Sequence, residues 1–269
     1  MRSTSITLFV LVSLLAFASS TTLWAQAPAV LESQAVQTPP APTHYMGREI
    51  ATTMHYLGAP WLVRESRDRE EDCELLLKEL DIQPGQTICD LGCGNGFYTL
   101  RLAELTGAEG KVYAVDIQTE MLDMLRQRAK AAGHDNIVTV RGTETDPRLP
   151  PASQDVVLLV DVYHEFSHPV PMLKAIRRSL KPGGRVAVVE FRAEDPQVPI
   201  KPLHKMSKRQ ILKEFRANGF ELADQFDGLP WQHLMFFVKR SAGREAGASE
   251  APAESAATPE RATSVAPVR

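Results

Sequence analysis

The chain has 269 residues, of which 43% are hydrophobic and 23% charged, and 30 basic against 33 acidic residues give a net charge of -3. These proportions are typical of a soluble globular protein, and the near-neutral charge argues against nucleic acid or an anionic membrane surface as a partner. The cysteines are Cys73, Cys89 and Cys93, an odd number without the paired spacing of zinc ligands. We therefore predict neither a disulfide framework nor a metal centre.

Residues 1–27 have the features of a secretory signal peptide. Arg2 carries a positive charge, residues 6–18 form an apolar run of 13 residues, and Ala25 and Ala27 fit a small-residue cleavage site. The run is shorter than the roughly 20 residues that a membrane span requires. We expect an exported protein, periplasmic or secreted, with no stable membrane insertion after cleavage. The alternatives are an uncleaved membrane anchor and a cytoplasmic protein that starts at Met46.

Two segments of biased composition delimit one predicted domain. Residues 28–45 are rich in Pro and Ala, and residues 241–269 are rich in Ala, Glu, Ser and Pro. Neither composition buries enough apolar surface to fold by itself, so we expect a linker in the first segment and a disordered tail in the second. The domain then spans residues 46–240, and its oligomeric state is left open.

Strand and helix patterns alternate along this domain. Strands are predicted at residues 87–91, 111–116, 137–141, 155–160, 185–191, 220–225 and 233–239. Helices are predicted at residues 68–80, 97–105, 119–132, 171–180 and 207–218, the last with Ser207 as its N-cap and Gly219 as its stop. The alternation predicts an α/β fold, in which a mostly parallel sheet has helices on both faces and the last two strands form a closing pair.

A glycine-rich loop connects the first strand to the next helix. Its glycines are Gly92, Gly94 and Gly96, and Asp90 precedes them at the end of the strand. Glycine permits positive φ and lets a ligand approach the backbone closely, and such crevices lie at the carboxyl ends of parallel strands. The dinucleotide-binding fingerprint requires a glycine at position 97, where this chain has Phe97.

The segment Asp-Leu-Gly-Cys-Gly-Asn-Gly at residues 90–96 resembles motif I of the class I S-adenosylmethionine (SAM)-dependent methyltransferases. Three further segments resemble the same family, in its type 11 or type 25 small-molecule branch: residues 112–116, 155–160 and 180–185. The resemblance covers residues 73–239. It implies a Rossmann-like, doubly wound sheet with an antiparallel last strand. It also implies methyl transfer from SAM to a small-molecule acceptor, with S-adenosylhomocysteine as the product.

The resemblance also implies a set of SAM-binding residues. Asp116 follows Gly96 by 20 residues at the end of the second strand, where a carboxylate can accept hydrogen bonds from both ribose hydroxyls; the alternative for Asp116 is a helix N-cap. The implied binding residues are Asp90, Gly92, Gly94, Gly96, Asp116, Ile117, Thr143, Glu144 and Asp161. Asp90 would reach the methionine part or only order the loop. Thr143 or Glu144 would replace the Gly-Asp of many relatives at the adenine.

Residues 161–166 follow the fourth strand and are expected to border the transferred methyl group. His164 has a side chain that titrates near neutrality and is the candidate general base, and Tyr163 or Glu165 is the candidate for orienting an acceptor. The alternative for His164 is a packing or surface role. Arg64 is a candidate partner of the SAM carboxylate, or else an exposed charge. The segment that contains His204 precedes the last helix, where substrate caps are often built.

Two other classes of protein remain open at this point. An NAD-type oxidoreductase would share the glycine loop and an acidic residue at the position of Asp116. Phe97 argues against this class, because it replaces the third glycine of the fingerprint. Antiparallel pairing of the last strands would be further evidence against it. A non-catalytic SAM-binding protein of the same fold is the other alternative. Export favours this alternative, or else an unprocessed leader with the protein facing the cytosol, because SAM is made in the cytosol.

Overall fold

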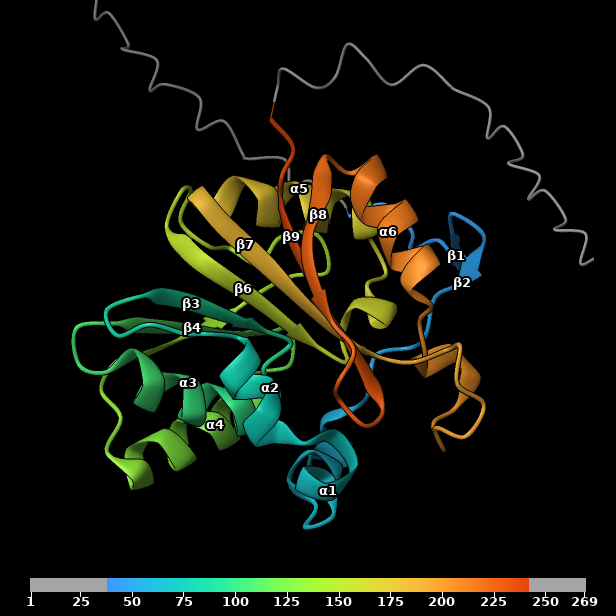
Figure 1. Cartoon of the computed structure of the whole chain (residues 1–269). Helices are drawn as coiled ribbons and strands as arrows, with labels where there is room; N and C mark the ends of the chain where they lie inside the picture. Colours follow the sequence, from blue (N-terminus) through green and yellow to red (C-terminus); the bar gives the residue numbers. More distant parts are fainter. Residues whose placement is uncertain (1–37, 242–269) are drawn as a thin grey trace, which may run out of the picture. The chain divides into compact units, whose positions relative to one another are not determined.

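The computed structural model describes residues 38–241, in which seven strands pair in the order β5-β4-β3-β6-β7-β9-β8 (Figure 1). The strands are β3 (Thr87–Leu91), β4 (Lys111–Asp116), β5 (Ile137–Arg141), β6 (Gln154–Val160), β7 (Leu180–Phe191), β8 (Phe220–Phe226) and β9 (Gln232–Lys239). Strands β3 to β7 are parallel, and β9 runs antiparallel to both β7 and β8. The predicted α/β fold with an antiparallel closing pair is therefore confirmed.

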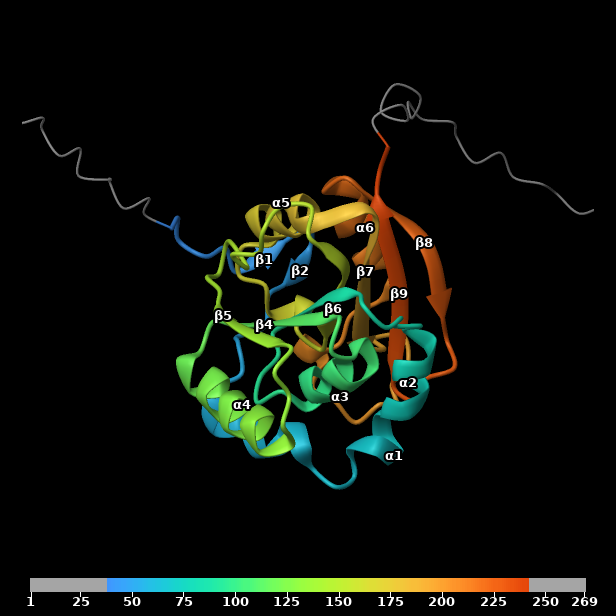
Figure 2. The ribbon, with the colours of Figure 1, turned by 90° about the vertical axis from the view of Figure 1, so that its left-hand side faces the viewer.

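Helices cover both faces of this sheet, with α2, α3 and α4 on one face and α5 and α6 on the other (Figure 2). The α-helices are α1 (Arg67–Glu71), α2 (Cys73–Glu79), α3 (Phe97–Thr106), α4 (Thr119–Ala132), α5 (Pro169–Ser179) and α6 (Lys208–Ala217). Three 3-10 helices are η1 (Tyr56–Val63), η2 (Tyr163–Glu165) and η3 (Pro202–His204). The helix α6 begins as predicted, because the Ser207 side chain accepts a hydrogen bond from the backbone N–H of Gln210 at 3.2 Å.

The strand β6 shows why the sheet is buried on both faces. Val157 and Leu159 pack into the core beneath α5 and α6, whereas Val156 and Leu158 pack into the core beneath α2 and α3. Successive side chains of a strand point to opposite faces, so an apolar run with no alternation supplies both cores. The chain winds outward from β3 through β4 to β5 and then returns to β6 on the other side of β3. This reversal is a topological switch point, where ligand crevices open in sheets of this kind.

The predicted helix at residues 68–80 is wrong as a single helix. Asp72 has a φ of +51° and separates α1 from α2, and its side chain accepts a hydrogen bond from the backbone N–H of Leu75 at 3.2 Å. Aspartate tolerates the left-handed conformation and caps a new helix with its short side chain. The break gives α1 a direction of its own, and Arg67 and Glu71 of α1 line the cavity described below.

The ordered fold begins before the predicted domain boundary at Met46. The short strand β1 (His44–Tyr45) lies in the segment predicted as a linker and pairs with β2 (Arg48–Glu49). Asn218, just after α6, donates a hydrogen bond to the Tyr45 hydroxyl at 2.8 Å, so this hairpin is tied to the domain. The predicted linker at residues 28–45 is therefore wrong at residues 44–45, which form a strand.

The predicted signal peptide, the remaining linker at residues 28–37 and the predicted tail at residues 242–269 lie outside the described residues. Within residues 38–241, no helix combines the length and apolar character needed to span a membrane.

Candidate active site

A cavity of about 530 Å³ opens at the carboxyl ends of the parallel strands. Such volumes are typical of small-molecule sites. The loops after β3, β4, β5 and β6 all contribute to its lining, together with the end of β7 and residues 199–204. Residues 53–71, which precede and include α1, supply the rest of the wall. The cavity therefore lies at the switch point between β3 and β6.

The glycine loop forms the floor of this cavity. Gly92, Gly94 and Gly96 have φ values of +76°, +53° and +85°, in the left-handed region that favours glycine. A Cβ at Gly92 would overlap the Val162 side chain, and one at Gly96 would overlap Leu125 of α4. Gly92 and Gly94 line the cavity, whereas Gly96 lets α3 and α4 approach closely. The predicted loop thus divides into two cavity residues and one packing residue.

Asp116 lies directly against the glycine loop. Its Oδ2 accepts a hydrogen bond from the backbone N–H of Gly94 at 3.0 Å, and its Oδ1 accepts one from the backbone N–H of Gln118 at 2.8 Å. Burial raises the pKa of the Asp116 carboxyl, and these backbone hydrogen bonds oppose the rise. The residue that precedes α4 as its N-cap is Gln118, so capping does not occupy Asp116. Since each carboxylate oxygen has a second lone pair, Asp116 retains the capacity to accept from a ligand.

Asp90 lies behind the loop and does not belong to the cavity lining among the described residues. It is 4% exposed, and its Oδ2 accepts a hydrogen bond from the Thr99 hydroxyl at 2.6 Å. Burial raises the pKa of the Asp90 carboxyl to about 6. Of the two roles left open for Asp90, this placement supports ordering the loop against α3 rather than direct contact with a ligand.

The Asp90→Asn variant should therefore change how stability depends on pH. A carboxyl whose pKa is about 6 when folded and about 3.9 when unfolded contributes most stability below pH 4, and this contribution is lost as the pH rises through 6. Asparagine does not titrate, so the variant does not lose stability from this position as the pH rises. Its free energy of unfolding, relative to the parent protein, should rise by about 2–3 kcal/mol between pH 4 and pH 7.

Urea unfolding at several pH values measures this difference. The control is Asp123→Asn, which alters a carboxyl that is 57% exposed. We expect the Asp123→Asn curve to run parallel to that of the parent protein. A parallel curve for Asp90→Asn as well would show that Asp90 is ionised at the same pH in both states, contrary to the prediction.

Four other predicted SAM-binding residues line the cavity: Ile117, Thr143, Glu144 and Asp161. The Thr143 hydroxyl accepts a hydrogen bond from the backbone N–H of Asp146 at 3.0 Å, so it also closes its own turn. Asp161 has a φ of +52°, and its Oδ2 accepts a hydrogen bond from the Gln232 side chain at 2.7 Å. Burial raises the pKa of Asp161 well above its usual range. Its Oδ1 is buried and has no hydrogen-bond partner among the described residues.

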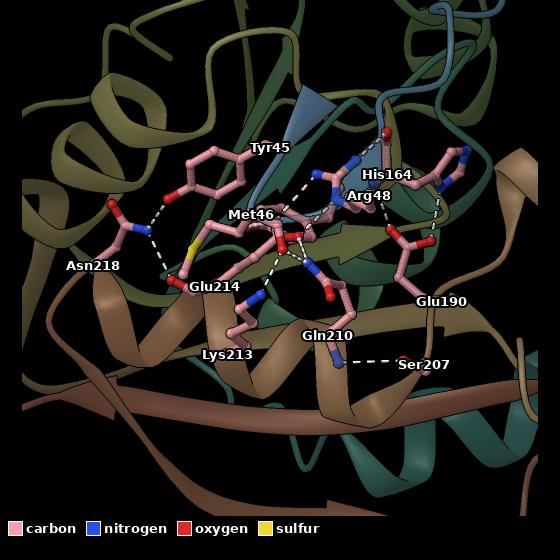
Figure 3. A network of polar contacts seen from close by, with 11 residues as sticks. Tyr45, Met46, Arg48, His164, Glu190, Ser207, Gln210, Lys213, Glu214 and Asn218 are labelled. Carbon is pink, nitrogen blue, oxygen red and sulfur yellow. Dashed lines mark hydrogen bonds and ion pairs between the residues drawn. The ribbon is translucent and has the colours of Figure 1, made fainter. Parts of the chain in front are cut away.

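His164 also lines the cavity and is 3% exposed. Its Nδ1 lies 2.7 Å from Oε2 of Glu190, and its Nε2 lies 3.0 Å from Nδ1 of His204 (Figure 3 shows His164 and Glu190). Burial lowers the pKa of His164, but the charge and hydrogen bond of Glu190 outweigh burial, so the pKa is raised. Burial raises the pKa of the neighbouring Glu165 carboxyl to about 7.

Tyr163, one of the two candidates for orienting an acceptor, does not line the cavity among the described residues. The side chain is fully buried, and its hydroxyl donates a hydrogen bond to Oε2 of Glu214 at 2.7 Å. Its ring packs against Phe166 and Phe215. In a 3-10 helix successive side chains point in different directions, so His164 faces the cavity while Tyr163 faces the core. This placement supports a structural role for Tyr163.

Of the two alternatives for Arg64, the structure does not support an exposed charge, because the side chain is only 11% exposed. Its guanidinium lies 3.8 Å from the centre of the Trp61 ring and forms ion pairs with Glu70 and Glu71 at 2.6 and 2.7 Å. Arg67, which sequence reasoning did not single out, pairs with Glu71 at 2.9 Å. Both arginines line the cavity.

Glu190, whose carboxylate contacts the His164 ring, was also not identified from the sequence. The signal that could have found it is an acidic residue at the end of an apolar strand, where the side chain reaches the edge of the sheet.

The strand order and the glycine loop with its facing acid define a class I SAM-dependent methyltransferase domain. A family model described as "Methyltransferase domain" matches residues 82–235, and the chain belongs to this family. A solved SAM dependent methyltransferase from Aquifex aeolicus is similar, with 25% identity and a TM-score of 0.65, and the match covers 69% of this chain and 98% of that one.

Two curated relatives are demethylmenaquinone methyltransferases. That of Geobacillus stearothermophilus is 31% identical over 115 residues, which are 43% of this chain and 49% of the relative. That of Lactococcus lactis subsp. lactis is 33% identical over 124 residues, which are 46% of this chain and 48% of the relative. The chain thus spans about half the length of the curated relatives it matches.

Proposed function

We propose that this protein binds SAM in the cavity and transfers its methyl group to a small-molecule acceptor. The observation that carries the proposal is the contact between Asp116 and the glycine loop, because it places a hydrogen-bonding carboxylate beside backbone that lines the cavity at Gly92 and Gly94. Asp116 would hold the ribose hydroxyls, and Ile117 would pack against adenine. Bound SAM supplies a methyl group on a cationic sulfur, and the reaction is an in-line displacement that depends on positioning.

The residues around the proposed methionine end also fit this ligand. Most buried polar atoms in proteins have partners, so the unpartnered Oδ1 of Asp161 in the cavity lining supports a hydrogen bond from a bound molecule there. The ammonium group of SAM is a donor of this kind, and Arg64 or Arg67 at the same wall would face its carboxylate. The product S-adenosylhomocysteine has the same groups and should bind at the same place.

The acceptor side of the cavity has apolar walls, formed by Val162, Phe166, Met172, Phe191 and Ile200. His164 and His204 line the same cavity. We infer an acceptor with an apolar body and an ionisable group, which the two histidines would face. The curated relatives carry the name demethylmenaquinone methyltransferase, so reduced demethylmenaquinone is the first acceptor to assay.

Isothermal titration calorimetry with SAM, S-adenosylhomocysteine and NAD tests the binding step. We expect one molecule of SAM or S-adenosylhomocysteine per chain with micromolar affinity and no heat from NAD. Binding of NAD alone would overturn the proposal. Transfer of labelled methyl from SAM to an acceptor tests turnover. Tight SAM binding with no transfer to a broad acceptor panel would favour the non-catalytic alternative.

We further propose that the protein is exported and that its leader is cleaved after residue 27. The proposal rests on the charged, apolar and small-residue pattern at residues 1–27. Mass spectrometry of the protein from its native host gives the N-terminus. A mature chain that begins at residue 28 supports export, whereas one that begins at Met1 or Met46 contradicts cleavage at this site.

A further inference from the structure

Three side chains that can bind a metal ion converge on one wall of the cavity. Nε2 of His164 lies 3.0 Å from Nδ1 of His204 and 3.8 Å from Oε1 of Glu165. One ligand atom from each of the three residues lies within 4.8 Å of the other two. His164 is buried, and the other two side chains are partly buried. This cluster, named here the His164 cluster, consists of His164, Glu165 and His204.

The spacing of the His164 cluster matches a mononuclear site for a first-row transition metal. Zn²⁺ binds histidine nitrogen and carboxylate oxygen at about 2.0–2.2 Å, so neighbouring ligand atoms lie about 3–3.5 Å apart. The 3.0 Å separation of the two nitrogens is within this range, and the 3.8 Å separation between Nε2 of His164 and Oε1 of Glu165 lies slightly outside it. Two histidines and one carboxylate are a recurrent ligand set for Zn²⁺ and Fe²⁺, and they leave coordination positions open.

Glu190 supplies the outer contact that a metal-binding histidine requires. Its Oε2 lies 2.7 Å from Nδ1 of His164, and its Oε1 accepts a hydrogen bond from the backbone N–H of His164 at 3.1 Å. A carboxylate at Nδ1 holds the ring proton on that nitrogen and leaves the Nε2 lone pair for a metal. Glu190 is fully buried, so its orientation is fixed by its surroundings.

The backbone of the cluster is also held in place. Arg48, in β2, donates a hydrogen bond from Nη1 to the carbonyl oxygen of His164 at 3.0 Å and pairs with Glu214 of α6 (Figure 3). Glu165 accepts a hydrogen bond from the backbone N–H of Met54 at 3.2 Å. The backbone of His164 is therefore fixed, and the Glu165 carboxylate is oriented by Met54 in the segment that forms the cavity wall.

We propose that His164, Glu165 and His204 bind one divalent first-row transition metal ion, with Glu190 as the orienting partner of His164. All three ligands line the cavity, so the open coordination positions would accept an oxygen of the small-molecule acceptor. A metal ion there would hold the acceptor and lower the pKa of its hydroxyl. The role of the metal ion toward the acceptor rests on the proposed methyl transfer, whereas the binding of the metal ion does not.

The test uses the full chain, stripped of metal with a chelator and free of SAM. Co²⁺ is titrated while its visible absorption is recorded, and Zn²⁺ is titrated in a calorimeter. We expect one ion per chain, micromolar or tighter affinity, and a Co²⁺ spectrum of low coordination number. Binding no tighter than millimolar, or several ions per chain with no preferred site, would overturn the proposal and leave His164 and Glu190 as a proton-accepting pair.

Variants of the cluster locate the ion. His204→Ala and Glu165→Gln change partly buried residues and should each weaken Zn²⁺ binding by more than about 100-fold. Glu190→Gln keeps an acceptor at Nδ1 and should cost about 10–100-fold. The control is His134→Gln, a histidine just after α4 with its Nε2 3.7 Å from Glu104, which should leave the affinity unchanged. Equal affinities in His204→Ala and His134→Gln would place the ion elsewhere and contradict the assignment.

SAM calorimetry on the same variants keeps the two proposals apart. His204 contacts His164, whereas Asp116 contacts the glycine loop at Gly94, so His204→Ala should bind SAM with the affinity of the parent protein. Loss of Zn²⁺ binding with retained SAM binding supports the metal site. Retained Zn²⁺ binding in a protein that binds no SAM would refute the proposed methyl transfer and leave the metal site standing.

Discussion

Replacing Asp116 with asparagine should weaken SAM binding by at least about 100-fold while the domain stays folded. Hydrogen bonds to a charged group contribute about 1.5–3 kcal/mol each, and about 1.4 kcal/mol corresponds to a tenfold change in affinity. The amide would also turn an N–H₂ group toward either the Gly94 or the Gln118 backbone N–H, both of which now donate to the carboxylate. The variant thus loses the charge and disturbs the loop at the same contact.

Calorimetry with SAM measures the affinity of Asp116→Asn, and a thermal melt of the same sample shows whether it is folded. Glu120→Gln is the matched control, because it removes an exposed carboxylate four residues away on α4. We expect the control to bind SAM normally. If Asp116→Asn bound SAM within about threefold of the parent protein, the carboxylate would have no part in holding the ribose, and the proposed site would be wrong.

The largest loss of stability should come from breaking the ion pair between Arg48 and Glu214. Nε of Arg48 lies 2.7 Å from Oε1 of Glu214, whose side chain is fully buried. Tyr163 and Gln210 donate further hydrogen bonds to the same carboxylate, both at 2.7 Å (Figure 3 shows Gln210 and Glu214). Removing one member of a buried pair leaves the other charge without compensation, at a cost of about 3–5 kcal/mol.

Urea unfolding of Arg48→Ala should therefore show a free energy of unfolding lower by about 3–5 kcal/mol. The double variant Arg48→Met with Glu214→Leu removes both charges and should be less destabilised than Arg48→Ala, because no unpaired charge remains buried. Arg126→Ala is the control, since its pair with Asp123 is about half exposed, at 49% and 57%, and should be worth less than about 1 kcal/mol. A loss of under about 1 kcal/mol for Arg48→Ala would show that Glu214 needs no cation.

The sequence by itself determined most elements of the large sheet and the glycine loop. The strands at residues 111–116 and 137–141 and the helix at residues 119–132 have the predicted bounds, because local periodicity decides which face of each element is buried. The sequence also determined the position of Asp116 relative to the glycine loop. In a parallel sheet the carboxyl ends of neighbouring strands lie at one edge, so an acid that ends β4 must approach the loop that ends β3.

Only the tertiary structure decided which polar side chains share the cavity. Asp90 and Tyr163 carry chemical groups suited to a site, yet both are turned away from it, toward Thr99 and Glu214. His204 and Glu190 lie 40 and 26 residues from His164 in sequence, and both contact its ring. Loops have no repeating pattern from which a side-chain direction can be deduced, so these contacts depend on how η2, β7 and η3 pack together.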